Sequence, residues 1–452
     1  MHLSVRLPDQ TGSQQAESIS GSRRALRTRR VAYHQQSMSR CPPHRRLAVV
    51  LAVALATLAS WAEANPRNAP ATASAEDYDT TLATGFELVY NLDFDEAINT
   101  FQRAVAERPD HPAPYRAVAV AAWLRILFER GTSLLDSYLA GSMYGPSGEF
   151  DDPPEELART FEQHAAHAIR LAEAAVREDP RDPDAHYELG VAVALDASYR
   201  ASILREPFQA LRSARRAYLA HDRVLELDPG YHDAKMLVGL YRYIVSVLPR
   251  PLRWMAYLVG FDGGKPEAIR ILADAARRST QVRTEAQFAL AMIYNREREF
   301  RRAHGVLNNL RRSFPRNRLL WIETGSTWLR DGRPALAELI LSHGFRRLER
   351  DHRDRMMGED AIWRLKRGTA LVGLGEGDLA RPDLVLAARD GAASWVRGRA
   401  HLELGKVHDL AGDHQSARGH YVRGGQICTQ AGDRGCARWA DWYREYPYRG
   451  PR

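Results

Sequence analysis

The sequence predicts an all-α fold in which tandem helix–turn–helix repeats stack into a right-handed superhelix. Two observations lead to this prediction. The stretch Tyr90–Tyr115 places apolar residues at helical spacing, stops at Pro109 and then begins again. The same order of small, large and helix-ending residues recurs along the chain with a period of about 34 residues. The second run therefore begins a new structural unit, rather than only a new helix.

The first unit is clearest when Tyr78 is counted as position 1. Gly85 then falls at position 8, Ala97 at 20, Phe101 at 24 and Pro109 at 32. Small residues at positions 8 and 20 allow two helix backbones to cross closely, and the large residue at position 24 fills the space beside them. Proline at position 32 ends the second helix because it has no N–H to continue the hydrogen-bond ladder.

The same positions recur in units that begin at Thr284, Arg318 and Gly398. Their counterparts at positions 8, 20 and 24 are Ala291, Ala303 and Leu307, then Gly325, Ala337 and Leu341, then Gly405, Ala417 and Tyr421. A further first helix is expected at Asp182–Leu195, and Leu225–Ala234 has the sequence of a junction between units. A Gly/Pro/Asp-rich loop insertion is expected near 129–157.

This pattern resembles the tetratricopeptide repeat and covers most of residues 76–431, so we expect a repeat domain at 77–431. The chain also resembles exported bacterial tetratricopeptide proteins. Gly239–Ala276 resembles part of a eukaryotic tetratricopeptide family linked to inclusion-body clearance. By the geometry of such repeats, positions 2, 5, 9, 12 and 13 of each unit face a concave groove.

The N-terminal residues 1–64 have the organisation of a leader. Basic residues end at Arg46, an apolar run follows from Leu47 to Ser60, and Ala62–Ala64 forms an A-x-A site. We expect translation to start at Met38, 38–64 to be a signal peptide cleaved after Ala64, and the protein to be periplasmic or secreted. Residues 65–76 would then be a linker and 432–452 a C-terminal tail.

The distribution of charge argues against nucleic-acid binding, and the cysteine content limits the possible disulfides to one. Nine arginines and three acidic residues lie in 1–64, so most of the net charge of +8 belongs to the leader and a nucleic-acid surface is not expected. Cys428 and Cys436 are the cysteines left after cleavage, and in an oxidising compartment they could form a disulfide or remain free thiols.

The sequence shows no arrangement typical of an active site, so neither enzymatic activity nor a cofactor is expected. His164 and His167 share a helix face, as do His401 and His408, but neither pair has an evident further ligand. A histidine-centred metal enzyme is therefore the weakest of three hypotheses. The second is a peripheral membrane assembly factor that uses the apolar segment Tyr241–Phe261.

The first hypothesis is a non-enzymatic scaffold of the cell envelope that binds a protein or peptide in the concave groove. Aromatic and methionine side chains would bury partner side chains, while asparagine and arginine would bind backbone amides and a carboxylate. The oligomeric state is left open. The candidate groove residues are Phe288, Met292, Asn295, Arg296, Ser326, Arg330, Arg399, Lys406 and Asp409.

Overall fold

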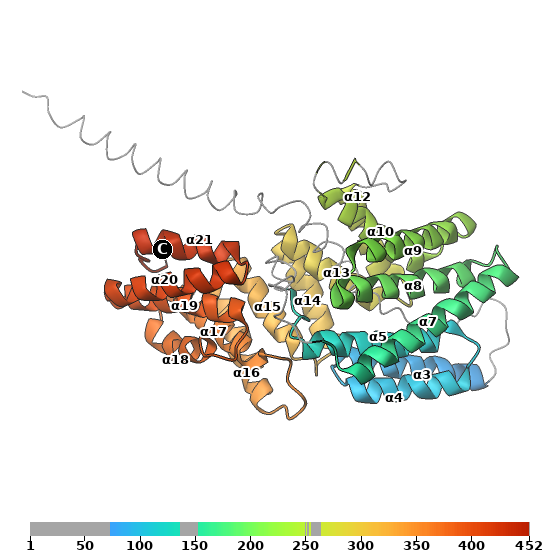
Figure 1. Cartoon of the computed structure of the whole chain (residues 1–452), viewed down its shortest axis with the longest axis horizontal. Coiled ribbons are helices and arrows are strands. Elements are labelled where there is room, and N and C mark those ends of the chain that lie inside the picture. The colour runs from blue at the N-terminus through green and yellow to red at the C-terminus, as the bar shows by residue number, and fades with distance from the viewer. Residues whose placement is uncertain (1–72, 136–151, 249, 251–252, 255–263, 452) are drawn as a thin grey trace, which may run out of the picture. The chain divides into compact units, whose positions relative to one another are not determined.

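Figure 1 shows the computed structural model of the chain, which describes residues 73–135, 152–248, 250, 253–254 and 264–451. The described residues form helices joined by turns and contain no strand. The all-α prediction is therefore confirmed. The leader, most of the loop insertion and most of 249–263 lie outside the described residues.

The helices follow one another as pairs, and each helix packs against the next one in the chain. The first four pairs are α3 (Ala73–Tyr90) with α4 (Phe94–Glu107), α5 (Pro112–Glu129) with α7 (Glu155–Glu178), α8 (Pro183–Tyr199) with α9 (Pro207–Leu227), and α10 (His232–Val247) with α12 (Lys265–Arg278). The later pairs are α13 (Arg283–Arg296) with α14 (Phe300–Ser313), α15 (Leu319–Arg330) with α16 (Pro334–Glu349), α17 (Glu359–Leu374) with α18 (Gly377–Ala387), and α19 (Ser394–Leu410) with α20 (His414–Gln430). A π-helical turn, η1 (Arg200–Leu204), joins α8 to α9, and α21 (Arg434–Glu445) follows the last pair.

The close crossing predicted for position 8 is present in the structure. A Cβ built on Gly85 would lie 2.2 Å from Cε1 of Phe101, the position-24 residue of the same unit. On Gly325 it would lie 2.4 Å from Cγ of Leu341, and on Gly405 it would lie 2.3 Å from Cε1 of Tyr421. Glycine at position 8 thus leaves room for the large residue at position 24.

The turn that joins the two helices of a pair also has a recurring backbone conformation. At position 15 the backbone is left-handed, with φ of 74° at Gly332 and 79° at Gly412. Leu92 and Arg298 occupy the same position in their units with φ of 69° and 62°. A side chain is strained in this region, so the turn geometry is imposed by helix packing rather than by glycine alone.

The first helices of the pairs are buried on nearly every side. In α5 the buried residues run almost without interruption from Arg116 to Phe128. The guanidinium of Arg116 is fully buried, and it donates from Nε and Nη2 to Glu188 of α8 at 3.2 and 3.1 Å. This ion pair links the first helices of two successive pairs inside the protein.

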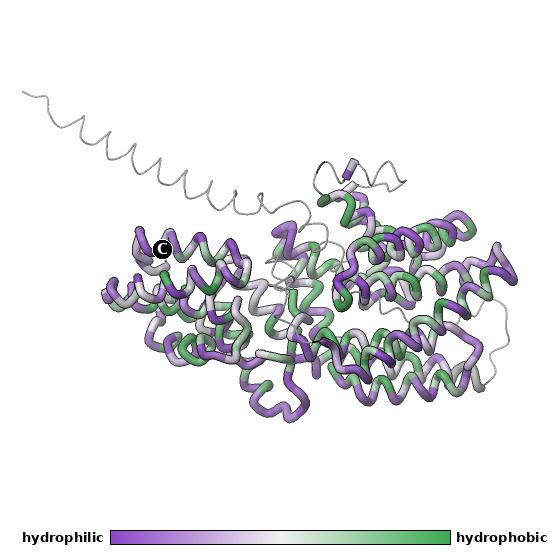
Figure 2. Tube along the Cα trace, in the orientation of Figure 1, coloured by the Kyte–Doolittle hydropathy of each residue, from purple (hydrophilic) through white to green (hydrophobic). Residues whose placement is uncertain are grey.

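Units distant in sequence also pack together, which a simple stack of repeats would not produce. The turn Tyr90–Asp93 contacts the α14–α15 junction: Asn317 Nδ2 donates to the Tyr90 carbonyl at 2.7 Å, and Arg316 donates to Asp93 at 2.8 Å. Arg353, in the hydrophilic connection between α16 and α17 (Figure 2), donates to the same Asp93 oxygen at 2.9 Å. We call these interactions the closing contact.

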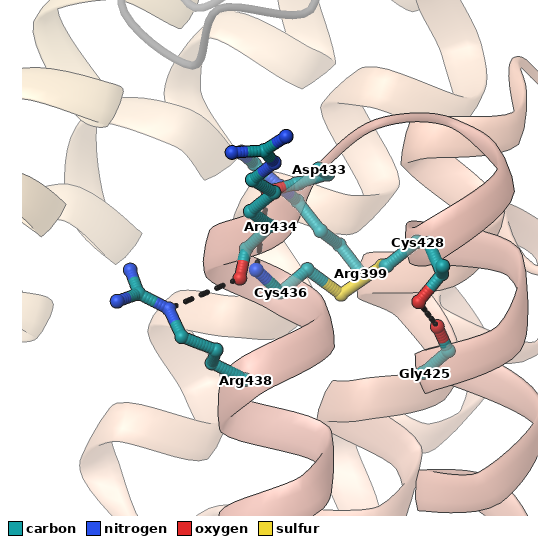
Figure 3. Close-up of a disulfide and its surroundings, with 8 residues drawn as sticks. Arg399, Gly425, Cys428, Asp433, Arg434, Cys436 and Arg438 are labelled. Atoms are coloured by element: carbon teal, nitrogen blue, oxygen red, sulfur yellow. Dashed lines mark hydrogen bonds and ion pairs between the residues drawn. A yellow bond between two sulfur atoms is a disulfide. The ribbon is translucent and has the colours of Figure 1, made fainter. Parts of the chain in front are cut away.

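Residues 432–452 were expected to form a C-terminal tail, but they contain a helix. Helix α21 lies within 432–452, and its N-cap Asp433 accepts from the Cys436 amide at 3.1 Å. Cys428 at the end of α20 forms a disulfide with Cys436, as Figure 3 shows. The sequence left open whether these cysteines form a disulfide or remain free thiols, and the structure has the disulfide. This bond fixes α21 to α20, the second helix of the last pair.

Candidate partner-binding site

A cavity of about 160 Å³ lies where the first unit meets α13, α14 and α15. Its wall is mainly apolar, with Leu92 from the α3–α4 turn, Leu124 and Leu127 from α5, and Phe288 and Met292 from α13. The closing contact borders it, since Tyr90 and Asn317 belong both to that contact and to the lining. The cavity therefore exists because the first unit packs on the middle of the chain.

Two glutamates interrupt this apolar wall. Glu285, at position 2 of its unit, is 2% exposed, and its Oε1 accepts a hydrogen bond from the Tyr90 hydroxyl. Its Oε2 has no hydrogen-bond partner within the described residues. Glu323 of α15 accepts from the Leu135 amide at 2.6 Å. The lining thus combines an apolar wall with a buried carboxyl group, one oxygen of which has no hydrogen-bond partner within the described residues.

Burial sets the protonation of Glu285. Loss of solvation disfavours its charged form and raises the pKa of Glu285 to about 8, although the Tyr90 hydrogen bond acts in the opposite direction. Burial also raises the pKa of Tyr90 well above its ordinary value. At neutral pH the Glu285 carboxyl is therefore expected to be mainly protonated, so that it carries a hydroxyl donor.

The volume is suited to a single apolar group. A cavity of about 150 Å³ lined by apolar side chains is large enough to bind benzene. The cavity of about 160 Å³ could therefore hold the side chain of a leucine or a phenylalanine. Burying such a side chain contributes about 1.5–3 kcal/mol, which corresponds to roughly ten- to a hundredfold in affinity.

Comparison with known proteins agrees with the repeat geometry. The Tetratricopeptide repeat family matches residues 82–146, 162–203 and 288–342. The chain contains tetratricopeptide repeats. The matched segments fall on α3–α5, α7–α8 and α13–α16, which include the six helices that line the cavity within the described residues, namely α3, α4, α5, α13, α14 and α15.

Several solved structures resemble this chain. The type IV pilus biogenesis factor PilW is 17% identical over 51% of this chain and 87% of its own, with a TM-score of 0.33. Yeast Tom70 is 11% identical over 82% and 89%, with a TM-score of 0.32. The human IFIT1 dimer with m7Gppp-AAAA is 12% identical over 89% and 87%, with a TM-score of 0.40. These scores are too low to inform function, and no curated protein matches the sequence.

The structure brings six of the predicted groove residues into one region. Phe288 and Met292 line the cavity, and the Phe288 ring lies 5.9 Å from that of Tyr90. Asn295, one turn further along α13, accepts from Arg330 Nη1 at 2.7 Å and donates to the Ala291 carbonyl at 2.9 Å. Ser326 is buried on α15. Arg296, the next residue after Asn295, is half-buried.

These contacts change the roles expected for the polar residues. Asn295 was expected to bind partner amides, but its side chain is 4% exposed and is already hydrogen-bonded within the chain. Arg330 is likewise held by Asn295 and lies 3.9 Å from Glu323. Because they are paired internally, Asn295 and Arg330 position α13 against α15. Phe288 and Met292 remain the predicted residues best placed to meet a partner.

The other three predicted residues lie near the C-terminus, in α19. Arg399 donates to Asp433 at 2.6 Å, and Lys406 donates to Glu403 at 2.7 Å. Asp409 is buried and accepts from the Tyr421 hydroxyl and the Tyr448 amide, each at 2.7 Å. Arg399 and Asp409 therefore bind the N-cap of α21, α20 and the last residues of the chain, whereas Lys406 binds Glu403 of its own helix, and none of the three lines the cavity.

The apolar segment Tyr241–Phe261 is only partly described. Tyr241 and Tyr243–Val245 are buried in the core of α10, because they pack between α9, α12 and α13. This half of the segment is therefore not a membrane-facing surface. The hypothesis that Tyr241–Phe261 contacts a membrane is wrong for these residues. Within the described residues, no helix is both long and apolar enough to cross a bilayer.

The histidine pairs have contacts of their own. His164 Nδ1 lies 2.8 Å from the Thr160 carbonyl, and His167 stacks on Tyr115 with ring centres 4.2 Å apart. His401 lies 3.0 Å from His420 between the two Nδ1 atoms, and burial lowers the pKa of His401 to about 4. Within the described residues, the one group close enough to share a metal is Cys428, Asp433 and Cys436, whose cysteines form the disulfide.

Sequence reasoning missed the residues that close the cavity. Leu92 and Asn317 lie in turns outside the groove positions of the repeat, and nothing local marks them. Tyr90, however, ends α3 at position 13 of the first unit, which is a groove position that the repeat numbering could have indicated. Glu323 also falls outside those positions. Glu285, by contrast, is at position 2, where a carboxylate on a helix otherwise rich in apolar residues was a detectable signal.

Proposed function

We propose that this protein is an exported, non-enzymatic scaffold that binds a protein or peptide by taking one apolar side chain into the cavity beside Glu285. Tetratricopeptide repeats generally serve as protein-interaction scaffolds and are generally non-catalytic. The observation that supports this site is the buried carboxyl of Glu285, whose Oε2 has no partner within the described residues. A partner backbone carbonyl next to the inserted side chain would accept a hydrogen bond from the Glu285 carboxyl.

The proposal also refines the concave-groove hypothesis. The first helices are extensively buried, so a long peptide has little exposed first-helix surface on α13 and α15. A single anchoring side chain needs only the cavity. Export and placement in the cell envelope rest on the leader 1–64 and are part of the proposal. Intact-mass measurement of the protein from a periplasmic fraction would test cleavage after Ala64.

Site-specific photocrosslinking tests the binding site. A photoreactive phenylalanine analogue would replace Met292 in the full chain, with Leu339 on the exposed face of α16 as the matched control position. We expect a discrete partner adduct from position 292 and none from position 339. Filling the cavity with Ala291→Leu should abolish the adduct, provided that circular dichroism shows an unchanged helix content.

Two results would contradict the proposal. Equal labelling from positions 292 and 339 would mean that the cavity is not the contact surface. An adduct that persists in the folded Ala291→Leu variant would mean that no side chain enters it.

A further inference from the structure

Helix α9 presents an apolar stripe to solvent. Phe208, Leu211 and Leu219 recur at helical spacing and are all exposed, with Phe208 86% and Leu219 53% accessible. The opposite side of α9 carries Ala210, Ala214 and Ala217, which are buried in the core. An exposed ring as large as that of Phe208 contributes no buried apolar area to the stability of the isolated molecule. The stripe is therefore a candidate surface for binding a partner.

Arginines accompany this stripe. Arg212 and Arg215 are exposed between Leu211 and Leu219, and α9 has no acidic residue from Pro207 to His221. Arg216 is held by Glu173 of α7, but within the described part of the chain no hydrogen bond or ion pair engages Arg212 or Arg215. The face is therefore both apolar and positively charged.

We infer that this α9 face, made of Phe208, Leu211, Arg212, Arg215 and Leu219, binds the surface of an anionic phospholipid membrane. A helix that lies in a membrane interface places apolar residues among the acyl chains and arginines at the phosphates. The face has this composition along about three turns of helix.

Charge and shape favour a membrane over a second copy of the chain or an acidic protein as the partner of this face. Self-association would bring Arg212 and Arg215 of two copies together, which like charges oppose. An acidic protein could satisfy the charges, but it would also need a hollow for the projecting Phe208 ring. A fluid lipid surface admits that ring without a preformed pocket. The inference is independent of the cavity, because α9 contributes no residue to its lining.

The size of the effect follows from the residues. Each arginine near an anionic surface contributes about 1 kcal/mol, or roughly fivefold in affinity, so Arg212→Glu with Arg215→Glu should lower vesicle binding by at least about 25-fold. Phe208→Ser removes an inserted ring and should lower it by roughly tenfold. Neither change should unfold α9, since these side chains are exposed.

Vesicle co-sedimentation tests the inference with the full chain. Vesicles of phosphatidylglycerol and phosphatidylcholine would be compared with pure phosphatidylcholine, at low and high salt. Leu339→Ser on α16, which is 60% exposed, is the matched control for removing an exposed apolar side chain. We expect salt-sensitive binding to the anionic vesicles only, weakened by both α9 variants and unchanged by the control.

Other outcomes would overturn the inference. If the wild-type protein does not sediment with anionic vesicles, the face does not bind membranes. If the α9 variants bind as tightly as wild type, another segment, such as the basic leader, is responsible. If an isolated acidic protein binds α9 while vesicles do not, the face is a protein-docking surface.

Discussion

Replacing Glu285 by glutamine should make the stability of this protein less dependent on pH. The side chain is buried, and the pKa of Glu285 is raised from 4.5 to about 8 because its charged form loses hydration. Glutamine has nearly the same shape and can still accept the hydrogen bond from Tyr90. The substitution therefore removes the titration while the packing around the cavity is retained.

The sign of the effect follows from proton binding. Between pH 4.5 and 8 the folded protein keeps a proton on Glu285 that the unfolded chain has lost. Rising pH therefore favours the unfolded chain, by about 1.4 kcal/mol per pH unit when the difference is a whole proton. The contribution of Glu285 to stability is complete below pH 4.5 and is lost as pH rises toward 8.

We therefore expect Glu285→Gln to gain stability relative to wild type as pH rises, by about 3 kcal/mol between pH 5 and pH 7.5. Urea unfolding followed by circular dichroism at several pH values would measure this difference. Glu87→Gln, an exposed position on α3, controls for the loss of a carboxyl group. A constant difference between Glu285→Gln and wild type across this range would refute the reasoning, because Glu285 would then not hold a proton in the fold.

Four further predictions concern stability and can be measured by the same unfolding experiment. Arg116→Met should cost about 3–5 kcal/mol because it leaves the Glu188 carboxylate buried without its partner, and adding Glu188→Leu should recover most of the loss. Gly85→Ala should cost about 1–3 kcal/mol because its Cβ would overlap the Phe101 ring, whereas Gly305→Ala, with nothing within 4 Å, should be neutral or stabilising by up to about 1 kcal/mol. Arg298→Gly should stabilise by roughly 1 kcal/mol because it relieves a side chain from φ of 62°. Cys436→Ser should cost about 2–4 kcal/mol and increase amide exchange in α21 first, since the disulfide holds that helix to α20.

Each of these predictions has an outcome that would contradict it. No recovery in the Arg116→Met, Glu188→Leu double variant would mean that Arg116 acts through packing rather than charge. Equal effects of alanine at Gly85 and Gly305 would remove the close-crossing explanation. A loss of stability in Arg298→Gly would show that the arginine side chain contributes more than the turn costs. Unchanged exchange in α21 after Cys436→Ser would mean that packing alone holds this helix.

Local sequence rules were sufficient for the repeats and insufficient for the site. Gly85 and Phe101 belong to one unit, so their spacing along the chain encodes their contact. The unit formed by α17 and α18 follows the same rule, with a Cβ on Gly368 placed 2.6 Å from Leu384, yet it was missed in the sequence. Tyr90 and Glu285 are 195 residues apart, and no periodicity relates them. The cavity depends on such long-range contacts.

The closing contact gives these distant residues a common function. Asp93 is shared between Arg316 and Arg353, and its side chain is almost fully buried, so separating the first unit from α14–α17 would cost the free energy of both ion pairs, although Arg353 would keep its second partner Asp351. That cost holds Tyr90 and Leu92 against the end of α13 and keeps the cavity closed on that side. A stack of repeats without this contact would expose Phe288 and Met292 along an open groove suited to an extended peptide. The closed arrangement instead selects for the size of one side chain. The closing contact, rather than any single groove residue, therefore determines which partners the proposed site could accept.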